Sequence, residues 1–297
     1  MVIATTARDG LLRRTLDSLS QCARPADFAG VVVVENGVAG DARDICQSVT
    51  TSLPIDYLHS EQPGKNRALN LALSQIADPT LTILCDDDIR FAGSFLDAYS
   101  TAAKNHPEGS FFGGPFGVDY EIHPPAWLKG YLPLSARGWQ PNEHDIRPRR
   151  TWFLGFNWAA FAGDLRRIGG FDEAVGPGSP SNSTGDEVLM QKRMHAAGML
   201  AKLVTGAMVW HHVPASRCTP QWALDRAYRD GQARAQYVRE KGGMRKLASD
   251  FNYRIKTLGA EAKLRTGLGV GDPSKLFQAQ HSVRKAAGYR AAIRPAA

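Results

Sequence analysis

Short apolar and β-branched runs alternate with segments of helical period along the first third of the chain. Leucines and alanines recur three and four positions apart between these runs, which predicts a helix after each strand. This alternation is typical of a mostly parallel sheet that is covered by helices on both faces. The predicted strands are Val2–Thr6, Gly30–Val34, Ile55–Leu58 and Leu81–Cys85.

The pattern becomes irregular after about residue 110, where Gly-Gly-Pro and Pro-Pro stretches precede an Arg-, Pro- and Trp-rich segment from 137 to 152. Regular structure is expected again from Trp152–Phe156 onward, including a Phe-Asn-Trp-Ala-Ala-Phe strand and a short helix near Asp164–Ile168. A Gly/Ser/Pro-rich loop follows. The later predicted elements are a helix over Asp186–Ala197, which ends at Gly198, and a strand over Ala207–Trp210.

The composition is that of a globular protein with one large or two small domains, since the chain has 297 residues, of which 43% are hydrophobic and 22% charged. No apolar run approaches the roughly 20 residues that span a bilayer, and the N-terminus lacks the features of a signal peptide. We therefore expect a cytoplasmic protein. The four cysteines lie far apart without a CxxC pair, which argues against a disulfide framework and a structural zinc site.

The net charge of +7 is concentrated in the last part of the chain. Residues 1–240 carry 24 basic and 26 acidic side chains, whereas residues 241–297 carry 12 basic and 3 acidic ones. A near-neutral body argues against nucleic acid as a partner. We expect a basic helical C-terminal extension over 241–297, whose apolar positions are Met244, Leu247, Ala248, Phe251, Ile255 and Leu258.

Two roles remain open for this extension. Its apolar stripe either packs on the preceding domain, which is slightly favoured because the stripe is short and lacks tryptophan, or contacts the anionic inner face of a membrane. In the second case the protein is peripheral at that membrane.

The strongest chemical signal is the run Asp86-Asp87-Asp88 at the end of a predicted strand. Ligands bind beyond the carboxyl ends of strands in sheets of this kind. Three adjacent carboxylates repel one another unless a cation neutralises them, and hard divalent ions prefer oxygen ligands. A solvated strand end is the equally weighted alternative.

Three further groups have a functional and a structural explanation, and alone the structural one is favoured for each. Lys65 and Arg67 open a helix, where backbone N–H groups and cations attract phosphate. Asp186-Glu187 opens another helix, where acidic residues also complement the helix dipole. His211-His212 follows an apolar strand, and imidazole can join carboxylates around a Mn²⁺-like ion.

These motifs occur in one order, together with Ile-Gly-Gly-Phe-Asp-Glu over 168–173 and Val-Trp-His-His-Val-Pro over 209–214. In this order the chain resembles the family 2 glycosyltransferases with the GT-A fold, a Rossmann-like mostly parallel sheet. The resemblance covers roughly residues 1–240 and is most specific from 152 to 217. It implies a catalytic domain with a nucleotide-binding half over 1–115 and an acceptor-side half over 116–240.

The resemblance also implies roles for particular residues. The acidic run corresponds to the DxD element, which engages a Mn²⁺ or Mg²⁺ ion and the donor. The catalytic base stays open between two residues because the usual Glu-Asp order is reversed here. The implied nucleotide-contacting residues are Thr5, Arg8, Glu35, Lys65, Arg67, Asp86 and Asp87; the metal-side residues are Asp86, Asp88 and His211; the candidate bases are Asp186 and Glu187.

The implied activity is that of a metal-dependent inverting glycosyltransferase. It moves a sugar from a UDP-, GDP- or dTDP-linked donor to a carbohydrate or lipid-linked acceptor, in polysaccharide, glycolipid or glycoconjugate synthesis. A nucleotidyltransferase and a non-catalytic sugar- or nucleotide-binding protein of the same fold are the alternatives. The first normally has a Gly-rich phosphate loop after its first strand, which this sequence lacks.

Overall fold

The structure is a computed structural model that describes residues 1–7, 10–49, 52–106, 109–179, 185–241, 251, 255, 257–262 and 272–293. The chain divides into two units. The first consists of Met1–Asp119 and Gly138–His212, and the second of Tyr120–Arg137 and Val213–Ala297. The catalytic-domain boundary at residue 240 and its two halves stay predictions.

A seven-stranded sheet with the order β3-β2-β1-β4-β8-β6-β9 lies at the centre of the first unit. Only β8 runs antiparallel to its two neighbours among these seven strands, so the mostly parallel sheet expected from the sequence is confirmed. The strands are β1 (Val2–Thr5), β2 (Val31–Asn36), β3 (Ile55–Ser60), β4 (Leu81–Asp86), β6 (Ser110–Gly113), β8 (Trp158–Phe161) and β9 (Leu200–Leu203).

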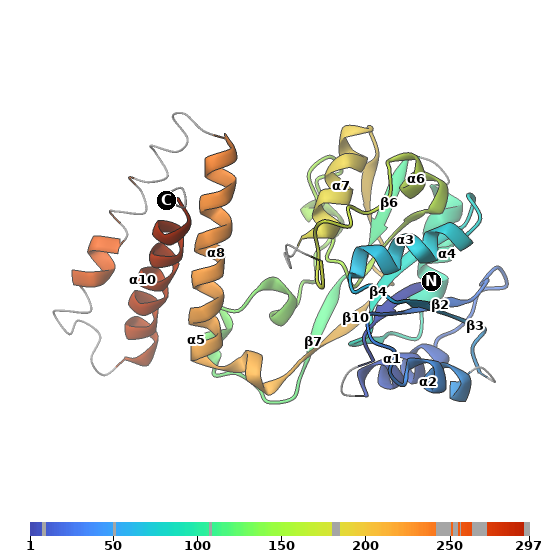
Figure 1. The fold of residues 1–297 in the computed structure, drawn as a ribbon, viewed down its shortest axis with the longest axis horizontal. Helices are drawn as coiled ribbons and strands as arrows, with labels where there is room; N and C mark the ends of the chain where they lie inside the picture. The colour runs from blue at the N-terminus through green and yellow to red at the C-terminus, as the bar shows by residue number, and fades with distance from the viewer. Residues whose placement is uncertain are drawn as a thin grey trace. The chain divides into compact units, whose positions relative to one another are not determined.

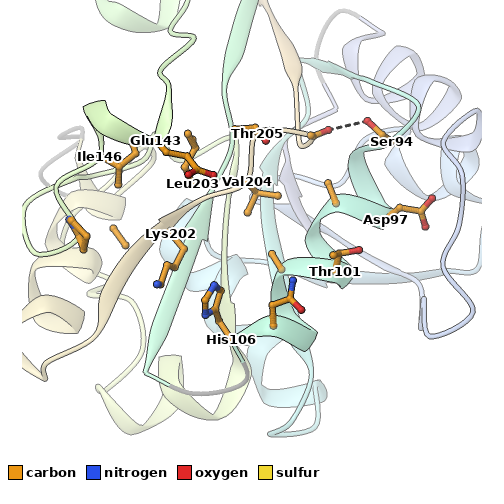
Figure 2. A pocket seen from close by; sticks show the side chains of 16 residues that line it. Ser94, Asp97, Thr101, His106, Glu143, Ile146, Lys202, Leu203, Val204 and Thr205 are labelled. Atoms are coloured by element: carbon orange, nitrogen blue, oxygen red, sulfur yellow. Dashed lines mark hydrogen bonds between the residues drawn. The ribbon is translucent and has the colours of Figure 1, made fainter.

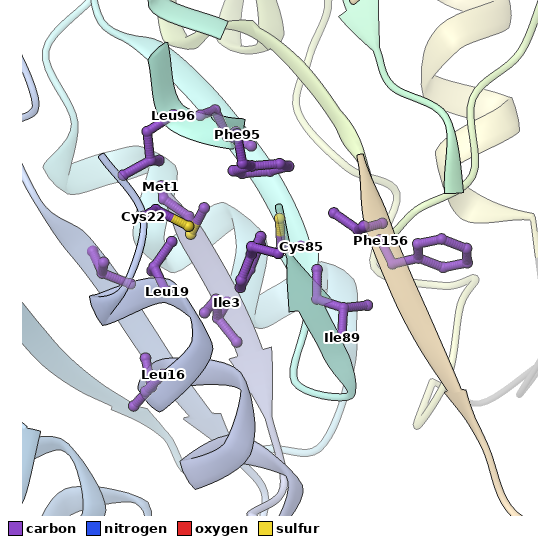
Figure 3. Close-up of a cluster of buried hydrophobic side chains, with 14 of the residues drawn as sticks. Met1, Ile3, Leu16, Leu19, Cys22, Cys85, Ile89, Phe95, Leu96 and Phe156 are labelled. Atoms are coloured by element: carbon purple, nitrogen blue, oxygen red, sulfur yellow. The ribbon is translucent and has the colours of Figure 1, made fainter. Parts of the chain in front are cut away.

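Helices cover both faces of this sheet (Figure 1). Successive strand residues point to opposite faces, so Ile3 of β1 packs in one core and Val2 in the other. The first core is closed by α1 (Leu11–Ser20), α2 (Ala42–Val49) and α4 (Phe95–Asn105), and part of it is shown in Figure 3. The second is closed by α3 (Lys65–Gln75), α6 (Ala162–Arg167) and α7 (Asp186–Ala196).

A three-stranded sheet of order β5-β10-β7 lies beside the acidic run. Its strands are β5 (Ile89–Phe91), β10 (Val209–Val213) and β7 (Phe116–Tyr120). The sequence did not predict β5, β6, β7 or β9, because these strands have only three to five residues, too few for a clear alternation. The helix α4 was not predicted either. The predicted strand over Ala207–Trp210 begins later and extends through both histidines.

Two long helices of the second unit, α8 (Pro220–Lys241) and α10 (Pro273–Ile293), lie side by side (Figure 1). Their backbones touch at two glycines. A Cβ atom on Gly288 would lie 1.9 Å from the Tyr228 carbonyl oxygen, and one on Gly231 would lie 2.0 Å from that of Lys285. The unit also contains the short helix α5 (Ala126–Lys129).

The predicted amphipathic stripe of the extension is described only in part, since Met244, Leu247 and Ala248 lie outside the described residues. Phe251, Ile255 and Leu258 are 67%, 53% and 65% exposed, respectively. None of the described helices is long and apolar enough to cross a membrane. All four cysteines are buried free thiols, as the sequence indicated.

Candidate active site

The three carboxylates of the acidic turn point to three different partners. Asp86, the last residue of β4, forms an ion pair with Lys65 at the start of α3. Asp87 Oδ2 accepts a hydrogen bond of 2.5 Å from the Thr5 hydroxyl. Ala4 lies opposite Asp86 in the parallel ladder, which explains why Thr5 reaches Asp87. The turn thus joins the carboxyl ends of β1 and β4.

The third carboxylate, Asp88, lies beside His211 of β10, with 3.6 Å between Asp88 Oδ2 and His211 Nε2. The His211 ring stacks on Phe156 at a centroid distance of 4.6 Å. His212 faces the other side of the strand, where its Nδ1 is 3.4 Å from an Arg14 guanidinium nitrogen. His211 is therefore the member of the pair that lies with the acidic turn.

A second group of charges gathers around Gly155, just before β8. A Cβ atom on Gly155 would lie 3.4 Å from Lys65 Nζ and 3.6 Å from Glu187 Oε2. Both side chains come from the first turn of a helix that follows a glycine at positive φ, Gly64 at 140° and Gly185 at 95°. These conformations are strained for residues with a Cβ atom, so the glycines let both helices begin at the carboxyl edge of the sheet.

Electrostatics connect the two carboxylates at the start of α7 to the acidic turn. Although burial opposes its charge, Asp86 and Asp186 raise the pKa of Lys65 above its ordinary value. Burial, together with the neighbouring Asp186 charge, raises the pKa of Glu187 from 4.5 to about 7, while Lys65 opposes this rise. A carboxyl group that titrates near neutral pH is suited to accept a proton in catalysis. Asp186 is only 6% exposed and lies beside Gly176.

The loop that carries Gly155 is fixed by buried side-chain amides. Gln191, one turn after Glu187 on α7, accepts a 2.7 Å hydrogen bond from the Phe153 N–H and donates one of 2.9 Å to the Phe153 carbonyl. Asn157 donates to the carbonyl oxygens of Pro115 and Ala207 at 3.0 and 2.8 Å. Helix α7 therefore holds both Glu187 and, through Gln191, the loop that carries Gly155. The roles of Gly155, Phe156 and Gln191 were not predicted from the sequence, although a glycine next to a phenylalanine just before the strand was an available signal for the first two.

Other predicted residues lie apart from this group. Glu35 is fully buried, and its carboxylate accepts hydrogen bonds from the Gly40 N–H and the Tyr57 hydroxyl at 2.8 and 2.6 Å. Burial and this carboxylate raise the pKa of Tyr57 to about 12. Arg67 forms a partly exposed ion pair with Glu173 at 3.1 Å. Arg8 lies outside the described residues.

Asn36 connects the loops at the sheet edge. Its amide donates to the Thr5 carbonyl at 2.9 Å and accepts from the Gly64 N–H at 3.1 Å. The start of the Gly/Ser/Pro loop is also attached to α3, because the Lys65 N–H donates to the Pro177 carbonyl at 3.0 Å. Residues 180–184 of that loop lie outside the described residues. The ends of β1, β2, β4 and α3 are thus linked by direct hydrogen bonds and ion pairs.

The residues around Asp88 fit a divalent cation whose ligands come partly from the protein and partly from a substrate. No group of three or more His, Cys, Asp or Glu side chains that could hold a metal ion occurs among the described residues. Asp88 and His211 nevertheless offer one carboxylate and one imidazole. Magnesium in nucleotide-dependent enzymes is usually held by one or two carboxylates plus substrate phosphates rather than by a full protein cage. Two protein ligands are sufficient for such a site.

The family model described as "Glycosyltransferase like family 2" matches residues 1–231 of the sequence. The chain belongs to this glycosyltransferase family. A validoxylamine A glucosyltransferase of Streptomyces hygroscopicus subsp. limoneus is 30% identical over 225 residues, which cover 67% of this chain and 48% of the relative. A second one, of subsp. jinggangensis, is 26% identical over 224 residues. The chain spans about half the length of these curated relatives.

Solved glycosyltransferases share the fold of this family member. The mannosyltransferase PcManGT of Pyrobaculum calidifontis, in complex with GDP-Man and Mn²⁺, superposes with a TM-score of 0.63 at 18% identity over 97% of this chain and 85% of that one. S. aureus TarS 1-349 in complex with UDP-GlcNAc gives a TM-score of 0.55 at 11% identity over 98% of this chain and 89% of that one. The GT-A fold expected from the sequence is confirmed.

Proposed function

We propose that this family 2 protein is a metal-dependent, inverting glycosyltransferase that moves a sugar from a nucleoside diphosphate donor to an acceptor hydroxyl. The position and charge of Glu187 carry the proposal. It is a carboxyl group with a pKa near 7, beside Gly155, which has no side chain, and next to a lysine that pairs with the acidic turn. Asp186, which is more buried, supports Glu187 by raising its pKa.

Glu187 accepts the proton of the acceptor hydroxyl while the hydroxyl oxygen attacks the anomeric carbon of the donor sugar. The bond from that carbon to the diphosphate breaks on the opposite side, so the configuration inverts. Positioned general bases typically contribute 10²- to 10⁴-fold to such a rate. We assign the base to Glu187 rather than Asp186, because burial and the Asp186 charge bring the pKa of Glu187 close to neutral.

The acidic turn and Lys65 act on the leaving diphosphate. A bound Mn²⁺ or Mg²⁺ would offset the negative charge that develops there. Asp88 and His211 would hold this ion, with Asp86 adjacent. Asp87, oriented by the Thr5 hydroxyl, contacts the nucleoside part of the donor, as does the loop that Asn36 ties to Gly64. Lys65 keeps its positive charge next to Asp86 and favours the additional negative charge that the diphosphate gains as it leaves.

The nature of the donor is part of the proposal. PcManGT was solved with GDP-Man and TarS with UDP-GlcNAc, which supports a nucleotide sugar as the donor, and both nucleotides belong in the test. The curated relatives are glucosyltransferases, so donors that carry glucose also belong in the test. A carbohydrate or lipid-linked acceptor, with the protein in the cytoplasm, is proposed.

The experiment measures release of nucleoside diphosphate from UDP-, GDP- and dTDP-sugars with Mn²⁺, for wild type and two matched variants. Glu187→Gln keeps the shape and removes the basicity, so we expect nearly complete loss of transfer with donor affinity retained. Asp186→Asn is the neighbouring control and should keep measurable transfer. Normal turnover by Glu187→Gln together with loss in Asp186→Asn would move the base by one residue. Release of pyrophosphate from a nucleoside triphosphate in the presence of a sugar 1-phosphate would instead indicate a nucleotidyltransferase.

A further inference from the structure

A polar groove of about 650 Å³ lies in the first unit along helix α4 and the edge strand β9. Figure 2 shows Asp97 and Thr101 of α4 on one side, and Lys202 of β9 together with Glu143 and Ile146 on the other. None of these residues belongs to the candidate active site. Cavities of roughly 300–1,000 Å³ are the usual size of small-ligand sites.

The polar side chains of the groove are not used by the fold. Asp97, Thr101 and Asn105 recur every fourth residue and so share one face of α4. Their side chains form no hydrogen bond or ion pair with any described residue, and the same holds for Glu143 and Lys202. Ser94, at one end, is bonded instead to the Gly206 carbonyl at 2.9 Å. The groove therefore presents a row of available donors and acceptors.

The lining between these side chains is partly apolar. It includes Ala98 and Ala102 of α4 and Val204, which follows β9 and is 6% exposed. The Ala201 side chain instead packs in the second core, on the other face of the sheet. A small apolar surface with hydrogen-bonding groups on both sides matches a sugar ring, which has C–H faces and hydroxyl groups around its rim.

Charge and edge geometry exclude other ligand classes. Two carboxylates, Asp97 and Glu143, face one cation, Lys202, so the lining does not favour phosphate or nucleic acid. The row of polar groups does not suit a lipid chain. Addition of a peptide strand is also disfavoured, because the Ala201 N–H of the edge strand is already bonded to the Pro148 carbonyl at 2.8 Å.

We infer that this groove binds a neutral carbohydrate chain. Asp97 and Glu143 accept hydrogen bonds from its hydroxyl groups, Lys202 donates, Thr101 and Asn105 do both, and the C–H face of a ring lies on the alanines. The groove ends at Ser94 and Gly206, close to the start of the β5/β10 ladder that carries Asp88 and His211 at its other end. The bound carbohydrate is therefore the part of an oligosaccharide acceptor that lies away from the reacting hydroxyl group. This last assignment rests on the proposed function, whereas the binding does not.

The test measures direct binding without a donor. Maltotriose, cellotriose, mannotriose and chitotriose are titrated to millimolar concentrations into ¹⁵N-labelled protein, with a Ser- and Asn-rich peptide of similar length as a comparison. We expect saturable shifts of the Thr101, Asn105 and Lys202 amide signals with at least one trisaccharide. Thr101→Trp fills the groove and should abolish them. Lys104→Trp places the same ring on an exposed position of the same helix outside the groove and should retain them.

Either of two results with the trisaccharides would overturn the inference: no saturable shift at these residues with any trisaccharide, or shifts that survive Thr101→Trp. Binding of the peptide in preference to every trisaccharide would do the same. Because no donor is present, these results are independent of transfer. If the groove binds a trisaccharide while Glu187→Gln retains normal turnover, the proposed mechanism fails and the groove stands. If transfer depends on Glu187 but the groove binds no trisaccharide, the proposed mechanism stands and the inference about the groove fails.

Discussion

Replacing Glu187 with glutamine should stabilise the protein at alkaline pH while it removes transfer. Burial raises the pKa of this carboxyl from 4.5 to about 7, so the folded protein holds its proton more tightly than the unfolded chain does. The wild-type free energy of unfolding therefore falls as the pH rises from the unfolded pKa through the folded one. Below pH 4.5 both states are protonated and the penalty is absent; above about pH 7 it is complete.

The size of this stability gain follows from the difference between the unfolded and folded pKa values of Glu187. At about 1.4 kcal/mol per pH unit, the change from 4.5 to about 7 corresponds to roughly 3 kcal/mol. Solvent around this half-buried carboxylate reduces the expected gain to about 1–2 kcal/mol. Glutamine has the same shape and no charge, so Glu187→Gln should gain this amount at about pH 8.5 and much less at about pH 5.

The assay is urea unfolding of both proteins at these two pH values. Glu61→Gln, an exposed glutamate of the same unit, is the control and should show little pH-dependent difference from wild type. The reasoning is refuted if Glu187→Gln is no more stable than wild type at alkaline pH, or if its gain is equal at both pH values. In either case burial would not oppose the charge of this carboxylate.

Three further predictions concern the same molecule. Asp88→Ala should abolish Mn²⁺-dependent donor binding in calorimetry, and wild-type affinity that is unchanged in EDTA would remove the metal from the proposal. Lys65→Met should move the acid limb of the kcat/KM pH profile upward by on the order of one pH unit, because a cation that lowers the pKa of Glu187 is lost; an unmoved limb contradicts this. If the basic extension contacts membranes, the double variant Phe251→Glu and Leu258→Glu should lose salt-sensitive co-sedimentation with anionic liposomes, and a wild type that never binds excludes that role.

We also predict that the Gly/Ser/Pro-rich loop over Gly176–Gly185, of which residues 180–184 lie outside the described residues, orders over the donor or acceptor as a lid. The described start of this loop is bonded to α3 through Pro177, next to Lys65. We expect hydrogen exchange in the loop to slow when donor and Mn²⁺ are added, because closure over a substrate removes the amides from water. Equally fast exchange in both conditions would count against a lid.

The first four strands and the GT-A fold could be predicted because four apolar runs recur along the chain with segments of helical period between them. The acidic turn and the starts of α3 and α7 were recognisable for a related reason, since charged residues directly after a strand or glycine lie at the sheet edge. Which carboxylate meets which partner was not predictable. That pairing depends on register, which places Thr5 beside Asp87, and on the alternation of β10, which separates His211 from His212.

Gly155, Phe156 and Gln191 were missed for different reasons. Gly155 acts through the side chain it lacks, so its importance appears only when Lys65 and Glu187 are seen next to it. Gln191 looks like an ordinary helix residue in sequence, but it is fully buried and bonded on both sides to Phe153. Its function depends on a contact 38 residues away, which no local pattern encodes.

The reversed direction of β8 affects how this family member can change over evolution. The chain enters β8 at the edge of the sheet where β1 and β4 leave it, so the residues before Trp158 border the site and those after Phe161 lie at the opposite edge. Insertions or deletions between Thr151 and Trp158 therefore change the residues beside Glu187, whereas length changes directly after Phe161 lie at the opposite edge of the sheet. Under the proposed function, acceptor choice can therefore diversify through this entry segment while the donor side of the sheet stays the same.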